Sequence, residues 1–206
     1  TETWHKTITE IQKYSIDSTR MKLPVIYGID AIHGTTYTAG ATMFPQQITT
    51  AASWNEENAY NMALVCAYET RASGIPWNFS PVLDLGLDPR FPRQFETFGE
   101  DPLMVERFGE AMIRGYQGEN NDISNKYSVA ACMKHFVGYH AVISGKDRTP
   151  AYIPDNVLSE YHIEPFKKAI EAGAKTVMIN SGLLNGVPVH ADYNLMINVL
   201  RNKLGF

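Results

Sequence analysis

The segment Val129-Ala-Ala-Cys-Met-Lys-His-Phe-Val-Gly138 decides the fold of this chain. It opens with an apolar run, Val129–Met133, that is typical of a strand buried in a parallel sheet. Lys134 and His135 follow at the point where that strand is expected to end. Parallel α/β folds carry their chemistry at the carboxyl ends of the strands, so this pair indicates a ligand-binding position. Taken alone, a lysine that reaches solvent and a hydrogen-bonded core histidine explain the pair equally well.

Three more strand-like runs flank this segment, and helical patterns alternate with all four. The strands are expected at Leu23–Asp30, Trp77–Leu85, Val129–Phe136 and Lys175–Ser181. The helices are expected at Glu2–Ser18, Asn55–Ser73, Pro102–Glu119, Ser159–Ala172 and Asp192–Leu204, with a kink or restart at Pro165. Alternating strands and helices predict a parallel sheet joined by right-handed crossovers.

The strand-helix units recur about every 50 residues, and four of them correspond to half of a (β/α)8 TIM-type barrel. We therefore expect residues 1–206 to be a partial N-terminal barrel catalytic domain, cut where a fifth strand would follow Leu204-Gly205-Phe206. The alternative is a small doubly wound sheet. No Gly-x-Gly-x-x-Gly turn follows any of the strands, so a dinucleotide cofactor has no support and no cofactor is expected.

Composition narrows the functional classes. The chain has 206 residues, of which 44% are hydrophobic and 19% charged, and a net charge of -4. These values are typical of a globular protein, and they give no basic footprint for nucleic acid. No apolar stretch approaches the roughly 20 residues of a membrane span. Cys66 and Cys132 are expected to be buried apolar residues, and they leave the compartment open.

Polar side chains follow each expected strand. Asp30, Asp84, Lys134 with His135, and Asn180 with Ser181 come at the four strand ends, so a barrel would bring them to one mouth.

A sugar ring presents paired hydroxyl groups, each both a donor and an acceptor. Asp30 can accept from two of them, while Arg93, Lys134 and His135 can donate to others. For Asp30 the competing interpretation is a turn or capping aspartate. For Arg93 it is an ion pair with Glu96 or Glu100.

Histidines also raise the possibility of a metal-dependent barrel hydrolase. His33, His135 and His140 lie near aspartates in the sequence. The chain contains no His-x-His pair, and these histidines lack the usual spacing of metal ligands. We therefore disfavour this class and expect no metal.

Five stretches together resemble glycoside hydrolase family 3, the β-glucosidase-like enzymes. They occur in the order that the family has, and they extend over nearly the whole chain. They are Pro24-Val-Ile-Tyr-Gly-Ile-Asp-Ala-Ile-His-Gly34, Phe79-Ser-Pro-Val-Leu-Asp-Leu-Gly-Leu-Asp-Pro-Arg-Phe-Pro-Arg93, Glu96-Thr-Phe-Gly-Glu-Asp-Pro102, Ala131-Cys-Met-Lys-His-Phe-Val-Gly138 and Asn185-Gly-Val-Pro-Val-His-Ala191.

The resemblance implies the N-terminal (β/α)8-like barrel of that family, with Asp30, Arg93, Lys134 and His135 contacting the non-reducing sugar. It places the nucleophilic aspartate on the next strand, shortly after a Leu-Gly-Phe such as Leu204–Phe206. It places the acid/base glutamate in a following domain. No catalytic residue is therefore expected within this chain. Its partners would be the remaining barrel strands and a following α/β domain.

Two departures from the family pattern affect the expected site. Many members have a tyrosine in a Ser-x-Tyr-Asn segment where this chain reads Asn180-Ser181-Gly182, so Ser181 is the candidate to hydrogen-bond in its place. The hexosaminidase branch has Pro-Gly-His-Gly after Lys-His-Phe and later Asp-Ser-His. This chain has Val137-Gly-Tyr-His140 and then Gly145-Lys-Asp-Arg148, which favours a glucosidase or xylosidase.

The resemblance thus implies a retaining exo-acting β-glycosidase that removes terminal non-reducing sugars from β-linked oligosaccharides or glycosides. The alternative is a non-catalytic sugar-binding or subunit-interaction module, because both reactive carboxylates are expected outside the chain. A periplasmic or extracellular location is favoured over a cytoplasmic one by the same resemblance.

Overall fold

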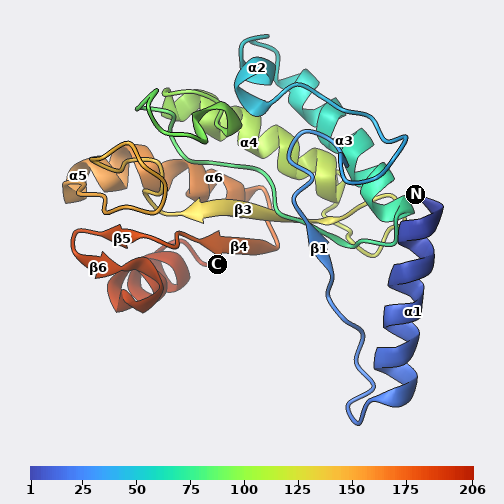
Figure 1. Cartoon of the computed structure of the whole chain (residues 1–206). Coiled ribbons are helices and arrows are strands. Elements are labelled where there is room, and N and C mark those ends of the chain that lie inside the picture. The colour runs from blue at the N-terminus through green and yellow to red at the C-terminus, as the bar shows by residue number, and fades with distance from the viewer.

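The computed structural model describes residues 1–206 and has an α/β fold built on one four-stranded sheet (Figure 1). The sheet has the order β1-β2-β3-β4, and all of its neighbours are parallel. Its strands are β1 (Gly28–Ile29), β2 (Trp77–Asn78), β3 (Ala130–Phe136) and β4 (Thr176–Ile179). The predicted parallel sheet with helical crossovers is therefore confirmed.

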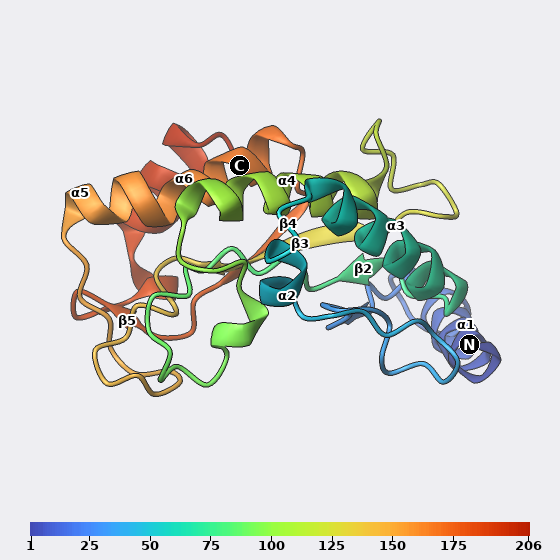
Figure 2. The same ribbon diagram turned by 90° about the horizontal axis from the view of Figure 1, so that it is seen from above.

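Three helices lie side by side along one face of the sheet, as both views show (Figures 1 and 2). They are α3 (Glu56–Ala72), α4 (Pro102–Gln117) and α6 (Glu164–Glu171), and the short α2 (Gln47–Ala51) precedes α3. The first helix, α1 (Glu2–Ser18), lies outside this layer, at the β1 side of the sheet. No helix of this structure combines the length and the apolar character needed to cross a membrane.

The helix before β4 is built from three pieces, not from one regular helix. The short α5 (Asp155–Val157) leads into a π-helical stretch (Leu158–Ile163), and regular α-helix restarts as α6 with Pro165 in its first turn. Proline has no N–H to donate to the preceding turn, so the restart predicted there is confirmed. The helix also begins four residues earlier than the Ser159 expected from the sequence. The last helix is likewise π-helical, over Asn194–Lys203.

The first strand is much shorter than the predicted Leu23–Asp30. Only Gly28 and Ile29 pair in the sheet. The preceding backbone is held by α1 instead, because the Gln12 amide donates to the Val25 carbonyl at 2.7 Å and accepts from the Val25 N–H at 2.9 Å. Ser15 Oγ donates to the Leu23 carbonyl at 2.6 Å. These side chains replace a neighbouring strand, and the apolar residues beside them remain exposed.

The second strand is also shorter than predicted, but its extended course continues toward the site. Regular pairing ends at Asn78, because Ser80 is followed by Pro81, which has no N–H for a ladder. Beyond it the Lys134 N–H donates to the Pro81 carbonyl at 3.0 Å, and the Leu83 N–H donates to the Lys134 carbonyl at 2.6 Å. This continuation carries Asp84 to the carboxyl end of β3.

A small hairpin follows β4. Its strands, β5 (Leu183–Leu184) and β6 (Val187–Pro188), are antiparallel and joined by Asn185 and Gly186, which both have positive φ. This Asn-Gly turn matches the twist of a tight hairpin. The Asn185 amide also bonds to both backbone groups of Ile153, at 2.8 and 2.9 Å, and so ties the hairpin to the loop that follows β3.

Close packing of α3 on α4 depends on Gly115. A Cβ at this position would lie 2.4 Å from the Tyr60 carbonyl oxygen and 2.7 Å from the Ala63 Cβ. Both obstacles belong to the backbone or to a rigid methyl group of α3, so the helices would have to separate to admit a side chain.

We therefore predict that Gly115→Ala destabilises the natural protein. Alanine improves intrinsic helix propensity by about 1 kcal/mol, but overpacking costs about 1–3 kcal/mol, so a net loss of up to about 2 kcal/mol in the free energy of unfolding is expected. Arg114→Ala, on the exposed face of the same helix, is the matched control and should stay within about 0.5 kcal/mol of wild type. Chemical denaturation measures both, and a Gly115→Ala protein as stable as the control would refute the packing argument.

Candidate functional site

Side chains from the carboxyl ends of the strands line a polar cavity of about 380 Å³. This volume lies in the range of small-molecule pockets, about 300–1,000 Å³. Only two of its ten lining residues are hydrophobic, which suits a ligand rich in hydrogen-bonding groups. The lining residues are Asp30, Ile32, His33, Thr36, Tyr37, Arg93, Glu96, Lys134, Asp147 and Arg148.

The centre of this cavity is an ion pair between β1 and β3. Lys134 Nζ lies 2.6 Å from Asp30 Oδ1, and the lysine side chain is 2% exposed while the aspartate side chain is 47% exposed. A buried ammonium group requires such a partner, because its desolvation is otherwise uncompensated. The exposed part of the Asp30 carboxylate remains available to accept hydrogen bonds from a ligand. The structure thus brings together two of the residues that the sequence singled out.

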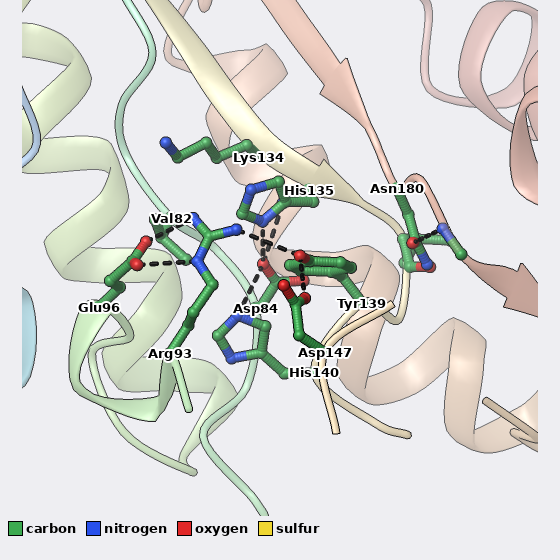
Figure 3. A network of polar contacts seen from close by, with 12 residues as sticks. Val82, Asp84, Arg93, Glu96, Lys134, His135, Tyr139, His140, Asp147 and Asn180 are labelled. Atoms are coloured by element: carbon green, nitrogen blue, oxygen red, sulfur yellow. Dashed lines mark hydrogen bonds and ion pairs between the residues drawn. The ribbon is translucent and has the colours of Figure 1, made fainter. Parts of the chain in front are cut away.

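Arg93, which also lines the cavity, is held in place by two neighbouring side chains (Figure 3). Its Nε and Nη2 donate to the two carboxylate oxygens of Glu96 at 2.8 and 2.6 Å, and Nη1 donates to the Tyr139 hydroxyl at 3.2 Å. The ion pair that competed with a ligand role is therefore formed. It does not exhaust the guanidinium, which has five N–H groups and keeps two for other acceptors. Burial lowers the pKa of Arg93, but Glu96 and Tyr139 outweigh it and raise the pKa overall.

His135 is held by the buried carboxylate of Asp84. The His135 backbone N–H donates to Asp84 Oδ2 at 3.0 Å, and the same oxygen lies 2.8 Å from His135 Nδ1. The sequence placed Asp84 at a strand end without giving it a role. The extended continuation of β2 past Pro81 is the feature that brings it beside β3, and strand-end position was the signal that could have found it.

His140 completes a buried polar cluster with these two residues. Its Nε2 lies 3.6 Å from Asp84 Oδ2, and neither ring nitrogen has a hydrogen-bond partner. Burial lowers the pKa of both His135 and His140, although Asp84 opposes this shift. Burial raises the pKa of Asp84, but His140 and His135 reverse the effect and leave it below its ordinary value. At neutral pH the cluster therefore holds one carboxylate and two neutral imidazoles.

By residue type this cluster could hold a divalent cation, since the ligand atoms of Asp84, His135 and His140 all lie within 4.8 Å of one another. The hydrogen bonding fits that use poorly. Asp84 Oδ2 already faces two nitrogens of His135, so this oxygen and the protonated Nδ1 are engaged with each other and are not free to bind a cation. His33, the other histidine of the metal alternative, lies apart, with Nδ1 2.9 Å from the Phe44 carbonyl oxygen.

Ser181 does not line the cavity. It follows β4 as an exposed residue, and no hydrogen bond of its side chain is formed within the chain. Its neighbour Asn180 is buried and donates to the Val137 carbonyl at 2.8 Å, which joins the ends of β3 and β4. Asp30, Arg93 and Lys134 therefore line one cavity, whereas neither His135 nor Ser181 is among its lining residues.

Two residues of the loop after β3 were missed by the sequence reasoning. The Tyr139 hydroxyl donates a hydrogen bond to Asp147 and accepts one from Arg93, so it links the loop to the arginine (Figure 3). Asp147 also lines the cavity. Nothing in the local pattern distinguishes these residues from ordinary loop residues, because their contacts depend on the path of the loop.

Comparison with known proteins identifies the family to which this chain belongs. Residues 1–206 match the glycosyl hydrolase family 3 N-terminal domain, and the chain is a member of that family. The predicted family resemblance is confirmed.

Two curated relatives give the extent of the match. The chain is 44% identical to a lysosomal beta glucosidase of Dictyostelium discoideum, over 98% of this chain and 25% of that protein. It is 32% identical to a periplasmic beta-glucosidase of Salmonella typhimurium, over 97% of this chain and 25% of that protein. The chain thus spans about a quarter of the length of these relatives.

Solved structures support the same fold. The beta-glucosidase of Listeria innocua superposes with a TM-score of 0.92 at 34% identity, covering 97% of this chain and 27% of that chain. A beta-glucosidase of Erythrobacter marinus superposes with a TM-score of 0.95 at 32% identity, covering 100% of this chain and 27% of that chain.

The buried histidines predict that stability falls on mild acidification. Their folded-state pKa values lie below the unfolded value of about 6.5, so the unfolded chain takes up protons first as the pH falls. In the pH range between the folded-state and the unfolded-state pKa, each such histidine lowers the free energy of unfolding by about 1.4 kcal/mol for each pH unit of acidification. Asp84 has the opposite kind of shift. Its contribution is present at neutral pH and is lost only at more acidic pH, as the pH falls through its folded pKa.

Denaturation of the natural protein and of His140→Asn between pH 8 and pH 5 measures this effect. The charged and titratable groups that act on the pKa of His140 are Asp84, His135, Arg93 and Glu96. Above about pH 6.5 the free energy of unfolding of the variant should differ from that of the wild type by a constant amount. Below that pH it should fall less steeply than that of the wild type. Parallel curves throughout the range would show that His140 does not titrate as described.

Proposed function

We propose that the natural protein containing this chain is a retaining exo-acting β-glycosidase of the β-glucosidase type. The observation that carries the proposal is the Lys134–Asp30 ion pair at a polar cavity, in a chain that belongs to glycosyl hydrolase family 3. In this proposal residues 1–206 are part of the N-terminal barrel domain. Further strands add to the outer edges of β1 and β4, and a following α/β domain completes the site.

The role of this chain is to hold the terminal sugar. Asp30 accepts hydrogen bonds from sugar hydroxyls, and Lys134 and Arg93 donate to hydroxyl oxygens, all three being charge-assisted bonds. Fixed side chains of this kind convert binding into orientation of the reacting bond. Retention requires a nucleophilic carboxylate and an acid/base carboxylate about 5–5.5 Å apart. Both are proposed to lie outside these 206 residues.

Carboxylates within the cavity support this division of labour. Asp30 is bonded to Lys134, Glu96 to Arg93, and Asp147 to the Tyr139 hydroxyl. Each acid that lines the cavity is therefore engaged in holding another side chain, which suits binding better than nucleophilic attack.

The proposed substrate class is a β-linked glucoside or xyloside. Structures of the Listeria innocua beta-glucosidase, and of a variant of it, are described in complex with glucose and with laminaribiose. A beta-xylosidase of Formosa agariphila is 35% identical to this chain, so a pentose is the second candidate. Because the relatives include a periplasmic and a lysosomal enzyme, we propose a compartment outside the cytoplasm.

The second candidate is a sugar-binding or subunit-interaction module without hydrolytic activity. It is favoured by the engagement of each cavity carboxylate described above. The intact mass of the natural protein separates the two. A product near the 23.1 kDa of this chain supports the module, and a product several times larger supports the enzyme.

Replacement of Asp30 tests the site directly. Asp30→Ala in the full-length protein should lower kcat/KM by orders of magnitude, because it removes an acceptor for the sugar and leaves Lys134 without its partner. Asp17→Ala, on the exposed face of α1, is the control and should leave kcat/KM unchanged. A loss below about tenfold, or roughly 1.4 kcal/mol, would remove Asp30 from the sugar site.

The stereochemical course tests the reaction class. Proton NMR of the first product formed from an aryl β-glucoside should show the β-anomer before mutarotation, as double displacement requires. An α-anomer as the first product would contradict retention, and no product from any aryl β-glucoside or β-xyloside would favour the binding module.

A further inference from the structure

A buried carboxylate that the proposed sugar contacts do not include lies directly behind His135. Asp84 is 3% exposed and sits on the extended continuation of β2. One of its oxygens, Oδ2, faces both the backbone N–H of His135 at 3.0 Å and the ring Nδ1 at 2.8 Å (Figure 3). Asp84 therefore holds both the main chain and the ring of the histidine that directly follows the cavity-lining Lys134.

This geometry determines where the imidazole carries its proton. The backbone N–H is always a donor, and an ionised carboxylate can only accept. Two acceptors would repel at 2.8 Å, so Nδ1 must carry a hydrogen that it donates to Asp84. The lowered pKa of Asp84 supports its ionised state, and the lowered pKa of His135 supports a neutral ring. In a neutral ring with a hydrogen on Nδ1, the other nitrogen, Nε2, holds a free lone pair.

The second ring nitrogen is the one available to a ligand. His135 Nε2 makes no hydrogen bond within the chain. Unlike the two ring nitrogens of His140, it is not fully buried. The side chain as a whole keeps 7% of its surface exposed. In Figure 3 this nitrogen lies on the edge of the ring away from Asp84, on the side where Lys134 and Arg93 lie.

We propose that Asp84 is a positioning residue that locks His135 with its hydrogen on Nδ1, so that Nε2 accepts a hydrogen bond from a sugar hydroxyl. From the sequence alone His135 was expected to donate to the sugar; in this proposal its Nε2 accepts instead. Lys134 and Arg93 are donors, so His135 and Asp30 supply the acceptors that sugar O–H groups need. This inference rests on the proposed function for the identity of the ligand, but not for the position of the proton.

Neutron diffraction from crystals of the natural full-length protein near neutral pD locates the proton directly. Deuterium is expected on His135 Nδ1 and not on Nε2. Deuterium on Nε2, alone or together with Nδ1, would overturn the proposal whether or not the protein hydrolyses glycosides. If the proton is found on Nδ1 but no glycoside is cleaved, the proposed function fails and the position of the proton stands.

Substitutions at Asp84 separate hydrogen-bond positioning from the effect of charge. Asp84→Asn keeps a carbonyl oxygen that can accept from both nitrogens, whereas Asp84→Leu has a similar branched shape and no acceptor. Loss of one positioned hydrogen bond should lower kcat/KM of Asp84→Leu about 10- to 100-fold, and Asp84→Asn should recover most of that loss. Equal losses in the two variants would overturn the positioning role in favour of a charge effect.

Asp17→Leu, on the exposed face of α1, is the matched control and should retain wild-type kcat/KM. Circular dichroism of each variant establishes that it folds. The neutron measurement on the wild-type protein keeps the proposal open to refutation if Asp84→Leu does not fold.

Discussion

The site depends on one electrostatic constraint, which is that the ammonium group of Lys134 is buried and must be neutralised. Asp30 meets that need from β1, two strands away in the sheet. The pair can form because β1 and β3 run in the same direction and bring their carboxyl ends to the same edge of the sheet. If these two strands ran in opposite directions, the two strand ends would lie at opposite edges. The sheet topology and the chemistry of the cavity are therefore a single property of this fold.

Much of the architecture could be predicted from the hydrophobic periodicity of the sequence and from the residues that begin or end helices. The apolar run before Lys134 predicted β3, and the proline of Asp101-Pro102 marked the start of α4, where Asp101 Oδ1 accepts from the Leu103 N–H at 2.9 Å. The first strand was overestimated because its apolar residues look like a strand wherever they lie. Side chains of α1 capture that backbone instead, and no pattern within Leu23–Tyr27 reveals such a long-range contact.

The site was predictable in the same partial way. Residues at strand ends were found because position along a parallel strand decides which edge they reach. Asp84 was placed at a strand end but was given no role, because it reaches His135 only through a proline-interrupted strand. Tyr139 and Asp147 were not found, because they reach the site through an irregular loop. From the sequence, Arg93 was expected to be either a ligand contact or an ion-pair partner. The structure shows that the pairing with Glu96 leaves donors free, so one side chain can serve both purposes.

The bidentate ion pair between Arg93 and Glu96 has a thermodynamic consequence for a ligand that binds beside it. Ordering a long flexible side chain at the moment of association costs about 0.5–1.5 kcal/mol. Here the guanidinium has already lost its rotational freedom during folding, so a ligand meets a rigid fork and gives up little affinity to immobilise it. Such preorganisation favours discrimination among stereoisomers, because an immobile donor cannot follow a hydroxyl group that points in another direction.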